Sequence, residues 1–220
     1  MARTDDKYHA ELEREVDEYL RSHGFIVPSA VTYHEVWPAE IKNLVASRQS
    51  MTALYLRSRA DRVAIHADLP IEFEWECKTN QKYFDLSFEA LPFMHHLAKA
   101  RLGVRCLLCI WNLRSGFHHG TWISWEVVDN IREIRVPDKC RMTDKEAFIR
   151  CCEELLPQVR VKPTGGTNGG SNDPFVVIDK SLAPAFPHWH DLIDDLFSRD
   201  SMQSSASITS PQGLFWDVQP

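Results

Sequence analysis

The clearest alternation of apolar and charged residues lies between residues 71 and 78, where Ile, Phe, Trp and Cys alternate with three Glu and one Lys. A period of two residues is typical of a β-strand, whose successive side chains point to opposite faces, and it does not suit a helix. We therefore expect a strand whose apolar residues face a core. The charged residues expected on its other face are Glu72, Glu74, Glu76 and Lys78.

A short strand candidate at residues 62–66 precedes this run, and residues 67–70 supply turn-forming side chains between the two. The pattern therefore predicts a β-hairpin. If the turn is centred at the midpoint of residues 67–70, antiparallel pairing places Asp61 opposite Glu76, with Cβ atoms about 4.5 to 5.5 Å apart.

Two carboxylates at that separation repel each other unless a cation or a proton lies between them. Lys78 follows Glu76 by two residues and is expected on the same face of the strand. Oxygen ligands that leave room for waters and phosphate oxygens suit Mg²⁺, with Mn²⁺ as a possible substitute. The hairpin therefore predicts a divalent-metal site at Asp61 and Glu76, with Lys78 beside it.

Beyond the hairpin, the pattern predicts a helix at residues 85–102, which Pro92 starts, kinks or divides and which Gly103 ends. A buried strand at 104–111 follows. It is expected to lie parallel to the central strand through a right-handed crossover. Another strand is expected at 121–127.

Three further elements are expected in the last 80 residues. Residues 143–146 (Thr-Asp-Lys-Glu) form a capping box that opens a helix running to Leu156. A short strand is expected at 175–178 and an amphipathic helix around 190–197. The resulting division of the chain is a core at 1–160, a flexible linker at 161–174, a C-terminal strand and helix packing on the core at 175–200, and a flexible tail at 201–220.

Composition agrees with a globular enzyme but does not select one. The chain has 220 residues, of which 44% are hydrophobic and 25% charged, so it can bury a full core. It contains no run of about 18 apolar residues, and acids at Asp5 and Asp6 lie where a signal peptide would be basic and then apolar. We therefore expect a cytoplasmic protein with no membrane partner.

The six cysteines are scattered along the chain and are expected to be reduced thiols. Cys106 and Cys109 invite assignment as a zinc site. They lie three residues apart on a predicted strand, however, so they face opposite sides and cannot bind one ion together. The ten histidines include several close pairs, but none has the spacing of a complete ligand set such as HExxH.

The net charge of −6 argues against a nucleic-acid substrate, because phosphate binding depends on Lys and Arg. The distribution is more favourable, since residues 41–113 hold ten Lys and Arg against seven Asp and Glu. Two of these arginines share one face of a strand expected at 52–59 and can face a DNA backbone, and Lys99 and Arg101 would extend that surface. The expected substrate-binding residues are Arg57, Arg59, Gln81 and Lys82.

The pattern formed by Asp61 and Glu76-Cys77-Lys78 resembles the PD-(D/E)XK phosphodiesterase superfamily, which includes type II restriction enzymes, archaeal Holliday-junction resolvases and RecB-type nucleases. The resemblance covers roughly residues 8–112. The proline that usually precedes the aspartate is Ala60 in this chain. Residues 31–51 form an insertion between the first strand and the hairpin.

The N-terminal segment 11–25 is similar to the helix that opens the junction resolvases. In those proteins a glutamate about three turns before a Gly-Phe pair reaches into the site. By this resemblance Glu13 is the best match for the helical acid, and Glu11 and Glu15 remain alternatives.

The resemblance implies a restriction-endonuclease-like α/β fold, with an αβββαβ core whose mixed central sheet is flanked by helices, followed by a C-terminal extension. It implies that Asp61, Glu76 and the backbone carbonyl of Cys77 bind the metal. Lys78 would orient the attacking water and stabilise charge on the phosphate, in preference to acting as a free base. Asp61, Glu76, Lys78 and Glu13 are thus the expected catalytic residues.

The function implied is a Mg²⁺-dependent deoxyribonuclease, which hydrolyses DNA phosphodiester bonds by attack of a metal-activated water. Cutting both strands usually requires a second site, so a homodimer is one expectation. The alternative is a catalytically inactive module of the same fold that binds nucleic acid or a protein partner. The sequence does not distinguish sequence-specific from structure-specific cleavage, endonuclease from exonuclease, or DNA from RNA.

Overall fold

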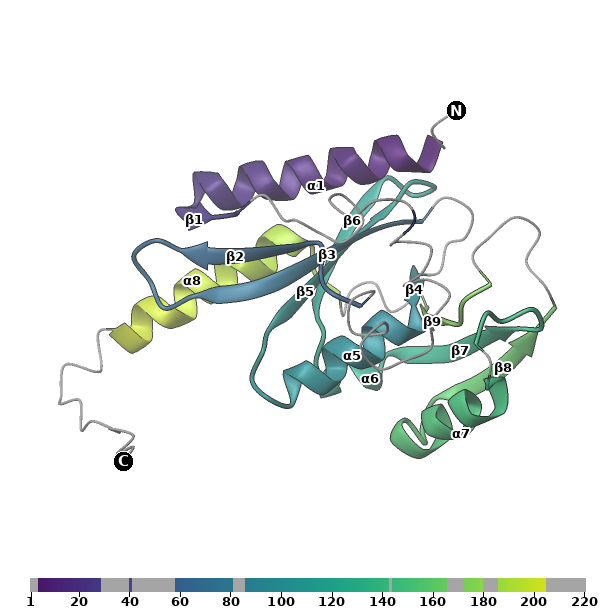
Figure 1. Ribbon diagram of the computed structural model, residues 1–220. Coiled ribbons are helices and arrows are strands. Elements are labelled where there is room, and N and C mark those ends of the chain that lie inside the picture. Colours follow the sequence, from purple (N-terminus) through teal and green to yellow (C-terminus); the bar gives the residue numbers. More distant parts are fainter. Residues whose placement is uncertain are drawn as a thin grey trace, which may run out of the picture.

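A five-stranded mixed sheet with the order β1-β2-β3-β5-β6 forms the centre of the computed structural model (Figure 1). Strands β3 and β5 are parallel, and the other neighbouring pairs are antiparallel. The strands are β1 (Phe25–Ile26), β2 (Arg62–His66), β3 (Glu72–Asn80), β5 (Cys106–Asn112) and β6 (Phe117–Trp122). The structure describes residues 4–28, 40, 58–80, 86–142, 144–165, 172–179 and 186–204.

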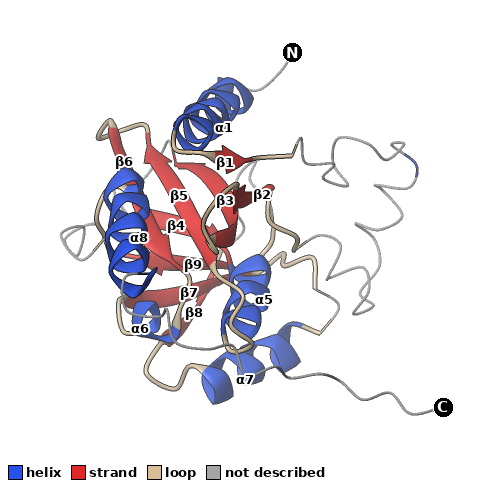
Figure 2. Ribbon diagram, turned by 90° about the vertical axis from the view of Figure 1, so that its left-hand side faces the viewer, coloured by secondary structure: helices blue, strands red, loops and turns tan. Residues whose placement is uncertain are grey.

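A second sheet has the order β4-β9-β7-β8 (Figure 2). Its strands are β4 (Leu86–Glu89), β7 (Ile131–Pro137), β8 (Arg160–Thr164) and β9 (Phe175–Ile178). Strand β7 is parallel to β8 and antiparallel to β9, and β4 is antiparallel to β9. The pairing of β4 with β9 joins segments that lie almost 90 residues apart in the sequence.

The described helices are α1 (Thr4–Ser22), α5 (Ala90–Ala100), α6 (Trp125–Val128), α7 (Lys145–Leu155) and α8 (Trp189–Ser204). Helices α1 and α5 lie on opposite faces of the central sheet, and α7 packs against β8 of the second sheet. Side chains of α1 and α8 share one buried cluster with β3 and β5, whereas α5 belongs to a second cluster with the other sheet. Figure 1 shows α1 and α5 on opposite sides of the sheet. The expected α/β class, with a mixed sheet flanked by helices, is confirmed.

The order α1, β1, β2, β3, α5, β5 reproduces the expected αβββαβ core, and the predicted parallel pairing of the strand after α5 is confirmed. Alternate residues of β5 enter the two buried clusters: Cys106 lies in the cluster with α5, and Cys109 in the cluster with α1. The expectation that these two cysteines face opposite sides is therefore confirmed. A strand buried on both faces carries apolar residues at successive positions, as β5 does.

The predicted hairpin register is confirmed. Arg62 pairs with Trp75 and Ile65 with Glu72, so the residue preceding β2, Asp61, continues that register toward Glu76. The charged face of β3 is not uniformly exposed. Glu72 is exposed, but Glu76 is only 6% exposed, because α5 and the second sheet cover this side of β3.

The segment expected as one helix at 85–102 is divided. Residues 86–89 form β4, and α5 begins at Ala90, which places Pro92 in the first helical turn, where its missing N–H costs no intrahelical bond. Gly103 follows the helix with a φ of 84°, a conformation that glycine adopts without steric cost. The single-sequence pattern missed β4 because its hydrogen-bonding partner, β9, lies far along the chain.

Two other expectations need correction. The strand expected at 121–127 lies earlier, at 117–122, and residues 125–128 form the short helix α6. The helix expected from the capping box is α7, but its N-cap is Asp144, whose carboxylate accepts a hydrogen bond from the Ala147 amide at 2.7 Å. Thr143 lies outside the described residues.

At the C-terminal end, the expected strand at 175–178 and the following helix are confirmed as β9 and α8. Residues 160–164, where we expected the linker to begin, form β8 and pair with β7. Most of the strand expected at 52–59 and the tail from residue 205 lie outside the described residues. None of the described helices is long and apolar enough to cross a bilayer.

Helix α8 begins very close to strand β6. The Gly120 amide donates a hydrogen bond to the Pro187 carbonyl at 2.9 Å, and a Cβ atom on Gly120 would lie 2.4 Å from the Cα of Trp189. Trp189 is fully buried beneath the sheet. Because Gly120 has no side chain, the start of α8 can pack this close to β6.

We predict that Gly120→Ala lowers the free energy of unfolding by about 1 to 3 kcal/mol, because backbone atoms of α8 must move to admit the methyl group. Gly165→Ala is the matched control, since the nearest atom to its new Cβ is an Asp138 oxygen at 3.9 Å. Urea unfolding measures both variants. Equal stability of the two would contradict the close approach.

Candidate functional site

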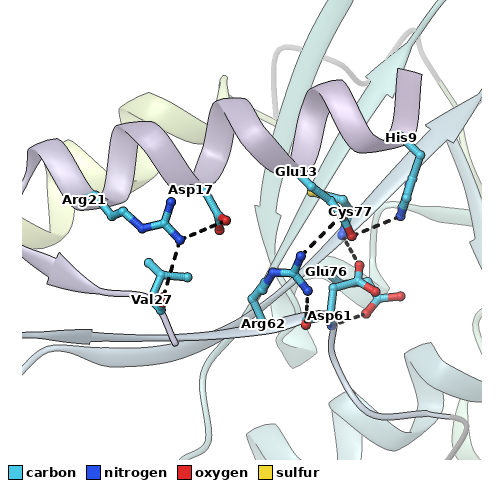
Figure 3. Close-up of polar contacts among 9 residues, drawn as sticks. All are labelled: His9, Glu13, Asp17, Arg21, Val27, Asp61, Arg62, Glu76 and Cys77. Carbon is cyan, nitrogen blue, oxygen red and sulfur yellow. Dashed lines mark hydrogen bonds and ion pairs between the residues drawn. The ribbon is translucent and has the colours of Figure 1, made fainter. Parts of the chain in front are cut away.

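Asp61 and Glu76 are joined by reciprocal hydrogen bonds at the end of strand β2. The Asp61 carboxylate accepts a hydrogen bond from the Cys77 amide at 2.8 Å, and the Asp61 amide donates one to Glu76 Oε2 at 3.1 Å. Figure 3 shows both carboxylates together below helix α1. Each carboxylate is thus held by the backbone of the opposite strand, so the separation between the two is fixed by the hairpin.

Lys78 completes this cluster. Its Nζ lies 2.6 Å from Glu76 Oε1, the oxygen that does not contact Asp61. On β5, the residues paired with Glu76 and Lys78 are Leu108 and Ile110, both buried in the apolar cluster shared with α5. The ion pair therefore lies against an apolar surface, where its charges are poorly solvated.

Burial raises the pKa of Glu76 to about 7, and the negative charges of Asp61 and Glu89 act in the same direction. The ammonium group of Lys78 opposes the increase through its charge and its hydrogen bond. A carboxyl group with such a pKa is a strong candidate for a functional site, because its ionised form requires a nearby cation.

Burial alone would lower the pKa of Lys78, but the charges of Glu76, Asp61 and Glu89 outweigh burial and raise it. Lys78 is therefore protonated at neutral pH. A protonated amine donates hydrogen bonds and offsets negative charge but cannot accept a proton, which supports the expected orienting role over a free-base role.

Glu13 on α1 approaches the same cluster. One of its carboxylate oxygens lies 3.4 Å from His9 Nε2, and the other lies 3.7 Å from an Arg62 nitrogen. Potential ligand atoms of His9, Glu13 and Asp61 all lie within 4.8 Å of one another. Burial acts to raise the pKa of Glu13, but the hydrogen bond and charge of His9, together with Arg62, lower it on balance.

The two alternative glutamates of α1 point elsewhere. Glu11 lies 3.6 Å from Lys7, and Glu15 lies 3.0 Å from His118 Nδ1. Of the three candidates, Glu13 is the one beside Asp61. The spacing follows from the helix, because residues two positions apart point in different directions around its axis.

The sequence pattern did not point to His9, Arg62 or Glu89 as members of this site. His9 lies four residues before Glu13, on the same face of α1, and its hydrogen bond to Glu13 is the main reason that its pKa is raised. Arg62 contacts Glu13 and also donates a hydrogen bond to the Asp61 carbonyl at 3.2 Å. The i, i+4 spacing of His9 and Glu13 was the available signal, whereas Glu89 reaches the site through the tertiary fold.

The expected substrate-binding residues are largely untested. Arg57, Gln81 and Lys82 lie outside the described residues, and Arg59 is exposed two positions before Asp61. Lys99 forms an ion pair with Glu74, and the Arg101 guanidinium lies 4.2 Å from the centre of the Trp125 ring. These two basic side chains are therefore engaged within the protein.

The residues present suit a hard divalent cation such as Mg²⁺. Asp61 and Glu76 bring two carboxylates to one end of the hairpin, and Glu76 is a buried acid whose negative charge a cation would stabilise. Glu13 and His9, both on α1, lie next to Asp61. The Cys77 group that contacts Asp61 is its amide, and metal binding by the Cys77 carbonyl stays a prediction.

Known proteins show only weak similarity to this chain. No family model matches the chain, and no curated protein matches it. Among solved structures, it is similar to a Holliday junction resolvase from the archaeal hyperthermophile Archaeoglobus fulgidus, at 12% sequence identity and a TM-score of 0.42. The alignment covers 84% of this chain and 94% of the resolvase chain.

The raised pKa of Glu76 predicts a pH-dependent cost to folding. Between pH 4.5 and about 7 the unfolded chain releases the Glu76 proton while the folded protein retains it, so the free energy of unfolding falls as the pH rises. In metal-free buffer, Glu76→Gln removes this dependence. The stability of the variant relative to wild type should rise by up to about 3 kcal/mol across that range and stay constant above it.

Urea unfolding at several pH values measures the difference. Glu72→Gln is the matched control, because Glu72 is an exposed glutamate on the same strand. A Glu76→Gln curve that remains parallel to wild type from pH 4.5 to 7 would show that Glu76 ionises normally in the folded protein.

Proposed function

We propose that the protein is a metal-dependent nuclease of the PD-(D/E)XK type that hydrolyses phosphodiester bonds, with DNA as the favoured substrate. The observation that carries the proposal is the single cluster of Asp61, Glu76 and Lys78, with Lys78 Nζ 2.6 Å from Glu76 and the two acids held by reciprocal hydrogen bonds. Glu13 extends the acidic side of that cluster. This combination of two acids and a lysine at a strand end is the one that the sequence pattern predicts.

Asp61 and Glu76 would hold a Mg²⁺ ion, which when bound stabilises negative charge on a phosphate and lowers the pKa of a coordinated water. Lys78 Nζ, which lies 2.6 Å from Glu76, would donate hydrogen bonds to the attacking water or to a phosphate oxygen. Because Lys78 stays protonated, the proton of the water must pass to another acceptor.

Glu13, as the acid next to Asp61, is the proposed acceptor or second anchor on the α1 side. Its lowered pKa keeps it ionised at neutral pH. His9 and Arg62 hold its two oxygens from opposite sides and so fix its position. In this proposal His9 and Arg62 are positioning residues.

Metal binding is the first test. We expect Mg²⁺ at 100 times its dissociation constant to stabilise the folded protein by about 2.7 kcal/mol, since the unfolded chain lacks the assembled site. Glu76→Gln should abolish this stabilisation, and Glu72→Gln should retain it. Thermal unfolding over a Mg²⁺ titration provides the measurement, and an unchanged response in Glu76→Gln would place the ion elsewhere.

Cleavage is the second test, with linear, supercoiled, single-stranded and branched DNA incubated with and without Mg²⁺ or Mn²⁺. Asp61→Asn, Glu76→Gln and Lys78→Ala should each reduce the rate at least about 100-fold, because each removes a group that stabilises the transition state. Glu72→Gln again serves as the control. Metal-dependent DNA binding with no cleavage on any substrate would favour the alternative of an inactive binding module.

Two other glutamates of helix α1 provide controls for the role of Glu13. Glu13→Gln should slow cleavage at least about tenfold, whereas Glu11→Gln and Glu15→Gln on the same helix should leave it within about twofold, because only Glu13 lies beside Asp61. Single-turnover cleavage rates distinguish these outcomes. A larger effect at Glu11 or Glu15 would overturn the assignment of Glu13.

A further inference from the structure

A second group of potential metal ligands lies along the same face of β3. Glu74 precedes Glu76 by two residues, its cross-strand neighbour on β5 is Cys106, and His96 approaches from α5. Potential ligand atoms of these three residues lie within 4.8 Å of one another. Three different elements of the fold thus bring a carboxylate, an imidazole and a thiol to one place.

Apolar packing alone does not explain why a histidine occupies the buried position of His96. It is only 1% exposed, and neither of its ring nitrogens has a hydrogen-bond partner. Buried polar groups in native proteins almost always have partners, because an unsatisfied group forfeits the hydrogen bonds it made with water. Its Nδ1 lies 3.8 Å from a Glu74 oxygen, beyond hydrogen-bonding distance.

The other two members suit a bound ion. Cys106 is only 1% exposed, so its thiol is shielded from solvent, whereas Glu74 is partly exposed and gives access from one side. Glu74 forms an ion pair with Lys99, which lies three residues after His96 on α5. Burial lowers the pKa of His96, so its imidazole is neutral and has a nitrogen lone pair for a metal. Burial raises the pKa of the Cys106 thiol, so a bound ion would have to displace its proton.

We propose that Glu74, His96 and Cys106 form a Zn²⁺ site, separate from the site at Asp61 and Glu76. A mixed sulfur, nitrogen and oxygen donor set is typical of zinc and differs from the all-oxygen preference of magnesium. In a tetrahedral zinc site the ligand atoms lie about 3.3 to 3.6 Å apart, so side-chain rotations must draw these donors together.

Charge balance is favourable. A thiolate and a carboxylate neutralise Zn²⁺, the neutral imidazole satisfies one orphaned nitrogen of His96, and a water can occupy the fourth position. Binding releases the thiol proton to solvent, and Lys99 either moves to the free oxygen of Glu74 or turns to solvent. The ion would then link α5 to β3 and β5, the elements that support Glu76 and Lys78.

Cobalt provides a direct test, because Co²⁺ substitutes for zinc and gives a near-ultraviolet charge-transfer band only when a thiolate is a ligand. The full-length, reduced, metal-free protein is titrated with Co²⁺. We expect a saturable band at one equivalent, displaced by Zn²⁺ and absent in Cys106→Ser. Cys109→Ser is the matched control, since Cys109 is a buried cysteine of the same strand that faces the other cluster, and it should retain the band.

Two further variants test the histidine ligand and the independence of the two metal sites. His96→Gln should weaken Co²⁺ binding at least tenfold, with far-ultraviolet circular dichroism confirming that it folds. Glu76→Gln should leave the band unchanged, so failure of the zinc site and failure of the nuclease proposal are distinguishable. A folded wild-type protein that gives no charge-transfer band, or a band that survives in Cys106→Ser, would overturn the zinc proposal.

Discussion

The structure depends on a row of charged residues on the covered face of β3. Glu76 is buried there, and Glu74 and Lys78 are half-buried on the side that α5 and the second sheet cover. A charge removed from water in this way is unfavourable unless it has a charged or polar partner. Lys78 forms an ion pair with Glu76, and Lys99 forms one with Glu74.

This burial constrains the hairpin end and raises the pKa of Glu76. The amide of Asp61 and the amide of Cys77 donate to side-chain carboxylates where the strand ladder would otherwise supply a carbonyl. Each carboxylate is then tied to the backbone of the other strand. Folding energy from the two hydrophobic clusters supports an arrangement that is electrostatically unfavourable in the absence of a cation, as is common at functional sites.

The two proposed metal sites differ because of what lies opposite β3. At Glu76 the neighbouring strand presents Leu108, and the additional donors are the oxygens of Asp61, so a hard ion is favoured. At Glu74 the neighbour is Cys106, with His96 above it, so a softer ion is favoured. Glu74 and Glu76 lie on the same face of one strand, but their different neighbours favour different metal ions.

Local alternation and turn residues were enough to predict the hairpin and its register, and the family resemblance implied the αβββαβ order. The register also predicted that Asp61, Glu76 and Lys78 share one patch. Tertiary structure decided what local periodicity cannot reveal: that the charged face of β3 is covered, that residues 86–89 pair with 175–178, and that Glu13 rather than Glu11 or Glu15 meets Asp61. These features depend on contacts between segments distant in the chain, and each is decided by packing across the sheet rather than by neighbouring residues.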